Sequence, residues 1–136
     1  MSELDLASVD EHTTELWDGL VPVLSDYIAI PALSPDFDAD WAANGHLDRA
    51  VELIESWCRA RPLEDMTVSV RRLEGRTPVV VCEVPATPGA EDVAPVLLYG
   101  HFDKQPEMEG WREDLGPWKP VLEGDRLYGR GGADDG

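Results

Sequence analysis

The most informative stretch of the sequence is Val96-Leu97-Leu98-Tyr99-Gly100-His101-Phe102-Asp103. It opens with a short continuous apolar run, which is typical of a central strand covered on both faces. His101 and Asp103 follow directly and stand two positions apart, so in an extended chain their side chains face the same way. The sequence therefore predicts a buried strand that delivers a histidine and a carboxylate at its carboxyl end.

Two helices are predicted on the amino-terminal side of this strand. Residues 9–30 carry apolar side chains at helical spacing on one face. Pro22 lies inside this helix, and because a proline removes a backbone hydrogen bond we expect a kink or break there. The second helix is predicted from about 41 to 60. Its buried face is expected to consist of Leu47, Ala50, Val51, Ile54, Trp57 and Cys58.

A β-hairpin is predicted between the second helix and the opening stretch. Apolar and polar residues alternate from 66 to 71, Glu74-Gly75-Arg76 forms a turn, and residues 78–84 form the second strand. After Gly100 the sequence predicts little regular structure apart from a short strand at 126–128. Helices followed by apolar strands predict an α/β domain with layered helix-sheet-helix architecture.

The composition limits the classes of partner. The 136 residues suit one modest domain, and 28 acidic against 11 basic residues give a net charge of −17. This charge argues against nucleic acid and against anionic membrane surfaces as partners. The acidic start lacks the features of a signal peptide and no apolar stretch is long enough to span a membrane, so we expect a cytoplasmic protein. The scarcity of lysine suits either a high-salt cytoplasm or a GC-rich genome.

Several other polar residues are expected to have ordinary roles. Cys58 and Cys82 stand in apolar contexts and are predicted to be reduced, buried thiols, with a disulfide or a thiolate metal site as the alternative. His12 and His46 stand in helical segments and are predicted to lie on the surface. The acidic loop 36–40 lacks the glycine and the glutamate of a calcium loop, which favours a solvated loop.

A second motif closes the sequence, Gly129-Arg130-Gly131-Gly132-Ala133-Asp134-Asp135-Gly136. Its glycines permit close backbone approach and positive φ. The adjacent carboxylates of Asp134 and Asp135 would repel each other in an apolar site, and a divalent cation removes that repulsion. A carboxylate has two oxygens, so Asp134 is able to bridge two metal ions.

Imidazole and carboxylate together are donors that zinc binds. His101 and Asp103 permit two arrangements, and their spacing does not choose between them. In the first arrangement, both side chains bind metal. In the second, His101 binds metal while the carboxylate of Asp103 accepts a hydrogen bond from the N–H of the other ring nitrogen.

These motifs resemble the zinc-dependent metallopeptidases of the carnosinase, acetylornithine deacetylase, aminoacylase and glutamate carboxypeptidase family. The resemblance is closest to the dipeptidase branch and covers essentially the whole chain. It rests on residues 98–106, Trp111, residues 118–120, residues 127–135 and, near the amino terminus, residues 30–34.

The resemblance implies a role for each site residue. His101 is a ligand of one zinc ion, Asp134 bridges two zinc ions, and Asp103 is a catalytic-site residue that supports His101. Cobalt or manganese are alternatives to zinc. The peptide bond between Asp134 and Asp135 is expected to be cis. A lysine commonly follows the acidic pair in the family, whereas this chain has Gly136.

The family continues for several hundred residues beyond these motifs. Its later part supplies a glutamate general base, further metal ligands and a lid domain that mediates dimerisation. We therefore expect residues 1–136 to be the amino-terminal portion of a catalytic domain, inactive alone. The parent would be a homodimeric hydrolase of peptides, as a dipeptidase or carboxypeptidase, or of N-acyl amino acids.

The alternative to this hydrolase fragment is a non-catalytic acidic binding module or the product of a truncated gene. In a fragment, strand 96–99 would lack a neighbouring strand and expose an apolar edge. We therefore expect the isolated chain to aggregate or to fold poorly.

Overall fold

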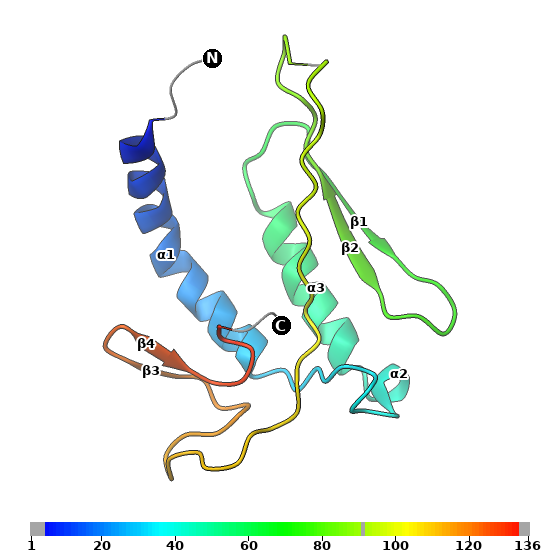
Figure 1. The fold of residues 1–136 in the computed structure, drawn as a ribbon, viewed down its shortest axis with the longest axis vertical. Helices are drawn as coiled ribbons and strands as arrows, with labels where there is room; N and C mark the ends of the chain where they lie inside the picture. Colours follow the sequence, from blue (N-terminus) through cyan, green and yellow to red (C-terminus); the bar gives the residue numbers. More distant parts are fainter. Residues whose placement is uncertain (1–4, 91, 134–136) are drawn as a thin grey trace.

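The computed structural model describes residues 5–90 and 92–133. Its first element is the helix α1, Leu6–Ile28, whose start is capped by the carboxylate of Asp5, which accepts hydrogen bonds from the backbone of Ala7 and Ser8. The helix passes through Pro22 as one continuous element, so the predicted break is wrong (Figure 1). The last residues of α1, Tyr27 and Ile28, are buried, and this packing offsets the hydrogen bond that proline removes.

The second predicted helix is divided in two by Gly45. Helix α2 spans Trp41–Asn44 and helix α3 spans His46–Arg59, and Gly45 between them has a φ of 75°. The side chain of Asn44 stabilises this division, because its oxygen accepts a hydrogen bond from the backbone of His46. The predicted face of α3 does pack inward. Leu47, Ala50 and Val51 are buried, and Ile54, Trp57 and Cys58 are half-buried.

The predicted hairpin is confirmed. Strands β1, Thr67–Arg71, and β2, Val79–Glu83, pair antiparallel, with Val68 opposite Cys82 and Val70 opposite Val80. Both strands pack against α3. The main core cluster lies between the end of α1 and the start of α3. It consists of Tyr27, Ile30, Ala32, Leu47 and Ala50, with Trp41, Leu53 and Phe102 packed against it.

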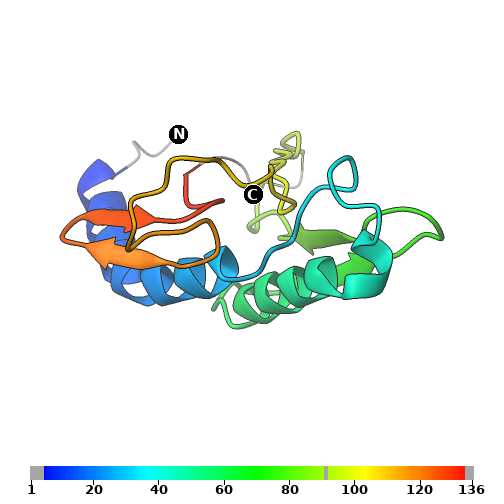
Figure 2. The ribbon, with the colours of Figure 1, turned by 90° about the horizontal axis from the view of Figure 1, so that it is seen from below.

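A second hairpin follows a long irregular segment. Strand β3, Val121–Glu123, pairs with β4, Arg126–Tyr128, through a two-residue turn in which Gly124 has a φ of 61°. Strand β4 was predicted and its partner β3 was not. Figure 2 shows α1 and α3 along one side of the molecule, with the long segment after residue 92 and this hairpin on the other.

The predicted central strand at 96–99 is wrong. Residues 5–90 and 92–133 form two separate two-stranded sheets, β1–β2 and β3–β4, and neither includes this segment. Its side chains are exposed, with 84% for Val96, 92% for Leu97, 87% for Leu98 and 89% for Tyr99. A continuous apolar run is buried only where other elements cover it, and here it crosses α3 as an unpaired extended segment (Figure 1). The segment thus exposes apolar side chains, as expected, but it forms no strand and so presents no strand edge.

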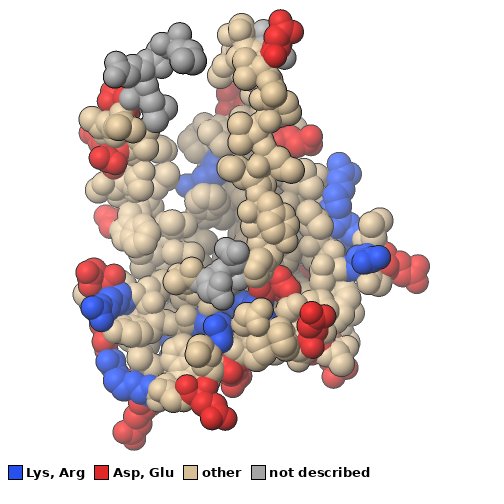
Figure 3. All heavy atoms as spheres, in the orientation of Figure 1, with Lys and Arg blue, Asp and Glu red and all other residues tan. Residues whose placement is uncertain are grey.

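The fold is a mixture of helices and small antiparallel sheets, which is compatible with the α/β class. The layered helix-sheet-helix arrangement was expected to form around a central sheet, and the described residues build no such sheet. Figure 3 shows charged side chains around the rim of one face, while the column formed by the segment after residue 92 is nearly uncharged. Of the helices that the structure describes, none has both the length and the apolarity to cross a membrane.

Candidate functional site

The carboxyl-terminal end of α1 holds the histidine-bearing segment in place. The hydroxyl of Tyr27 donates a hydrogen bond to the carbonyl of Phe102 at 2.9 Å. The backbone of Lys104 donates to Ala32 at 2.8 Å and accepts from Ser34 at 2.9 Å. Residues 102–104 are thus tied to the end of α1 and the turn after it, although 70 or more positions separate the partners along the chain.

The side chain of Lys104 completes this attachment. It is only 1% exposed, and its ammonium donates to the carbonyls of Tyr27 at 2.6 Å, Ile28 at 3.3 Å and Ile30 at 2.7 Å. Carbonyls at a helix carboxyl terminus carry partial negative charge, which favours a cation there. The ammonium also lies 4.0 Å from the centre of the Tyr27 ring. Burial lowers the pKa of Lys104 to about 8.

Lys104 is a structural residue that sequence reasoning missed. Lysines are rarely buried, so residue type alone places this side chain in solvent. The one available signal was its position directly after the His-x-Asp motif, in a chain with only two lysines.

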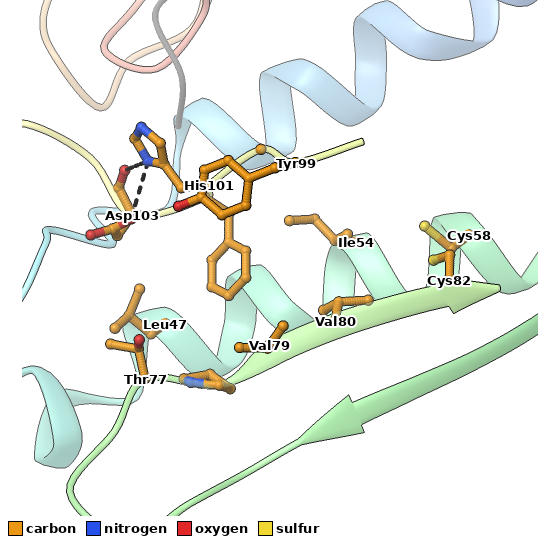
Figure 4. A pocket seen from close by; sticks show the side chains of 13 residues that line it. Leu47, Ile54, Cys58, Thr77, Val79, Val80, Cys82, Tyr99, His101 and Asp103 are labelled. Atoms are coloured by element: carbon orange, nitrogen blue, oxygen red, sulfur yellow. Dashed lines mark hydrogen bonds and ion pairs between the residues drawn. The ribbon is translucent and has the colours of Figure 1, made fainter. Parts of the chain in front are cut away.

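His101 and Asp103 contact each other as the spacing suggested. Nδ1 of His101 lies 2.9 Å from the backbone oxygen of Asp103 and 3.1 Å from its Oδ1 (Figure 4). Both of these oxygens are acceptors, so Nδ1 is the ring nitrogen that carries a proton and donates it toward Asp103. The side chains are 34% and 28% exposed, so an ion from solvent is able to reach the histidine.

The glycine-rich segment packs on the same helix end. Gly129 has a φ of 147°, and a Cβ placed on it would overlap the side chain of Ile28. The guanidinium of Arg130 donates to the carbonyl of Pro106 at 2.7 and 3.0 Å, and its backbone donates to Pro117 at 2.8 Å. Only glycine permits this close approach of the backbone to α1.

The two motifs meet at one cavity. Gly131 and His101 both line a space of about 300 Å³ that Tyr27 also lines. Asp134, Asp135 and the peptide bond expected to be cis lie outside the described residues. Within 5–90 and 92–133, no three side chains of the histidine, cysteine, aspartate and glutamate types come together as a metal site.

His101 also lines a larger cavity of about 380 Å³. Residues 99–103 form one of its walls, and α3 and β2 form the opposite wall with Ile54, Val80 and both cysteines (Figure 4). The cysteines are thiols, as expected, but Cys58 is half-buried and Cys82 is exposed, so the prediction of two buried thiols is wrong. Strand β2 lies at the edge of a two-stranded sheet, and that position leaves Cys82 open to solvent.

The other two histidines differ from each other. His12 is exposed on α1, as predicted. His46 is half-buried at the start of α3, and its Nδ1 is a buried atom for which the described residues offer no hydrogen-bond partner. The prediction of a surface role for His46 is therefore only partly right. The acidic loop is a local turn, in which Asp38 accepts hydrogen bonds from Asp40 and Asn44.

Comparison with known proteins gives one informative similarity. No protein-family model matches the chain. A segment of 41 residues is 56% identical to a succinyl-diaminopimelate desuccinylase of Gluconobacter oxydans (strain 621H). The aligned part covers 29% of this chain and 10% of the desuccinylase, so the chain matches a small part of that relative's length.

Proposed function

We propose that this chain carries part of the metal site of a metal-dependent amide hydrolase. The observation that carries the proposal is the attachment of both motifs to one helix end. Hydrogen bonds of Tyr27 and Lys104 hold the segment that contains His101. Gly129, which precedes Asp134 in the sequence, packs against the side chain of Ile28. His101 of the first motif and Gly131 of the second motif therefore line the same cavity.

An imidazole and a carboxylate suit a divalent ion of intermediate hardness, such as zinc. His101 carries its proton on Nδ1 beside Asp103, which is the arrangement of metal-binding histidines that use Nε2 and a carboxylate partner. In this proposal His101 and Asp134 hold metal, and the ions are two zinc ions, with cobalt or manganese as alternatives. Such ions supply Lewis acidity toward a carbonyl oxygen and lower the pKa of water.

The residues of this chain position the site. Asp103 holds the imidazole ring in one orientation and in one tautomer. Lys104 donates its ammonium hydrogens to the end of α1, so it acts as a structural cation and not as a group that binds substrate. The general base and the remaining ligands belong, in this proposal, to a longer and dimeric parent protein, and the chain alone lacks turnover.

The proposed substrate class is an N-acyl amino acid, with dipeptides as the second candidate. The support is the name of the similar protein, which describes removal of a succinyl group from succinyl-diaminopimelate. Both substrate classes contain an amide bond next to a carboxylate, and hydrolysis of either needs the same metal chemistry. A cytoplasmic location would suit either class.

Zinc binding by the chain tests the site. In a background with Cys58→Ser and Cys82→Ser, which removes competing thiols, we expect weak zinc binding in isothermal titration calorimetry. His101→Ala should abolish it, whereas His12→Ala removes an exposed imidazole on α1 and should leave it unchanged. Equal affinity in the His101→Ala variant would contradict the proposed site.

Hydrolysis is tested on the protein encoded by the full genomic reading frame. We expect release of succinate from N-succinyl amino acids, loss of activity after chelation, and recovery with zinc. Full activity after exhaustive chelation would reject the metal-dependent mechanism. Activity toward dipeptides alone would keep the mechanism and change the substrate class.

A further inference from the structure

The wall of the larger cavity opposite His101 contains both cysteines of the chain, on two neighbouring elements. Cys58 lies in the last turn of α3 and Cys82 near the end of β2. Figure 4 shows their sulfur atoms next to each other at one end of the cavity, and Cys82 contributes to the raised pKa of the Cys58 thiol. The 23 positions between them in the sequence are spanned by β1, the turn and most of β2.

The packing of α3 on the hairpin explains why the thiols meet. Arg59 directly follows Cys58 and donates a hydrogen bond from its guanidinium to the carbonyl of Val68 at 2.8 Å. Val68 stands directly opposite Cys82 in the antiparallel pair β1–β2. Residues opposite each other in such a pair project from the same face of the sheet, and buried Val68 projects toward α3. Cys82 therefore also faces the helix end that carries Cys58.

We propose that Cys58 and Cys82 form a reversible disulfide, with a low-molecular-weight peroxide as the oxidant. Hydrogen peroxide takes up two electrons and two protons from the thiols and leaves as two molecules of water. One sulfur–sulfur bond forms, and two sulfur–hydrogen bonds and one oxygen–oxygen bond break. The proposal concerns the thiols alone and is independent of the proposed hydrolase function.

The environments of the two thiols give the order of steps. Cys82 is exposed, so its thiolate is the nucleophile that attacks the peroxide, becomes a sulfenic acid and releases the first water. Burial and the contact with Cys82 raise the pKa of Cys58 to about 11, so this thiol stays protonated and resists direct oxidation. Its sulfur then attacks the sulfenic sulfur and breaks the sulfur–oxygen bond, and the leaving hydroxide takes up the Cys58 proton and departs as the second water.

The bond would fasten the end of α3 to β2, and so fix the cavity wall that faces residues 99–103. It closes a loop of about 25 residues, which stabilises a protein by restricting the unfolded chain. We expect the melting temperature to rise by roughly 10 °C on oxidation. Reduction with dithiothreitol should reverse the rise.

The experiment treats the complete chain with hydrogen peroxide in the presence of a chelator, so that bound metal plays no part. We expect intact mass to fall by two hydrogen atoms, both thiols to disappear, and a proteolytic map to contain one peptide pair joined through Cys58 and Cys82. Covalent dimers, or thiols oxidised separately to sulfinic acids, would overturn the proposal.

Two comparisons show whether the fold positions the thiols. The same oxidation in guanidinium chloride should be at least about tenfold slower in closing the bond, because the unfolded loop rarely brings its ends together. Equal rates would contradict the proposal. In the single variants, Cys82 in Cys58→Ser should react with iodoacetamide at neutral pH about tenfold faster than Cys58 in Cys82→Ser. The opposite order would reject the assignment of Cys82 as the attacking thiol.

Discussion

The ammonium of Lys104 lies 2.6 Å from the carbonyl oxygen of Tyr27, a residue 77 positions earlier in the chain. This contact joins the segment after the His-x-Asp motif to the end of α1. The same helix end packs against Gly129, so one turn of helix supports both parts of the candidate site.

Removal of the buried ammonium should destabilise the fold. Lys104→Met keeps the length of the side chain but leaves the carbonyls of Tyr27 and Ile30 without this donor, which should lower the free energy of unfolding by about 2–3 kcal/mol. Lys119→Met is the matched control, since Lys119 is exposed and donates to a single carbonyl, and should change it by less than about 0.5 kcal/mol. Urea unfolding measures the free energy of unfolding of both variants. Equal losses in the two variants would show that Lys104 has no special role in stability.

Stability should depend on pH through the same side chain. Because burial lowers the pKa of Lys104 to about 8 from 10.5, the unfolded chain holds more protons than the folded chain between these values. The free energy of unfolding should therefore rise from pH 8 toward pH 10.

Tyr27 acts in the opposite direction at still higher pH. Its burial and the nearby Asp103 raise its pKa above the ordinary value of 10, so stability should fall once tyrosine ionises in the unfolded chain. Urea unfolding at a series of pH values measures the profile. The Lys104→Met variant should lack the rise between pH 8 and 10, and a rise that persists in this variant would assign it to another group.

The hairpin β1–β2 could be predicted from sequence because its information is local. Alternating residues and the turn at Glu74-Gly75-Arg76 specify both strands and their connection. The attachment of Lys104 to α1 could not be predicted, since it depends on contacts across more than 70 positions. The prediction of a strand at 96–99 was wrong for a related reason. An apolar run indicates a tendency to be buried, but it does not supply the neighbouring strands with which it would pair.

The candidate site was predictable in part. The spacing of His101 and Asp103 placed the two side chains together, and the structure adds which ring nitrogen faces Asp103. The joint support of both motifs by Tyr27 and Ile28 was not accessible from sequence, because nothing in a helical pattern reveals what its last turn contacts.

The close contact between Gly129 and Ile28 predicts a strong effect of one methyl group. Gly129→Ala places a Cβ against the side chain of Ile28 and imposes a strained φ, which should lower the free energy of unfolding by about 2–4 kcal/mol. Gly19→Ala is the control, because a Cβ there meets nothing within 4 Å and alanine favours the helix, giving a gain of roughly 0.5–1 kcal/mol. Thermal unfolding compares the two, and a tolerated Gly129→Ala would disprove the contact.

The exposed apolar segment should make the chain prone to self-association. Leu97 and Leu98 are 92% and 87% exposed, on a stretch whose backbone is unpaired within the part of the chain that the structure describes. Leu97→Glu should reduce association seen by light scattering and leave the free energy of unfolding nearly unchanged. Leu122→Glu, on the half-exposed hairpin β3–β4, is the control and should leave scattering high. A sharply melting, monomeric wild-type chain would contradict the expected association.

The contact between Asp103 and His101 predicts how metal affinity responds to a change beside the histidine. In the serine background that removes both thiols, Asp103→Asn should weaken zinc binding about tenfold, because an amide offers no negative charge to the Nδ1 proton. Asp125→Asn, in the exposed turn between β3 and β4, removes the same charge from the surface and should leave affinity unchanged. Titration calorimetry measures the affinities. If both variants weaken binding equally, zinc responds to the net charge of −17 and not to His101 held by Asp103.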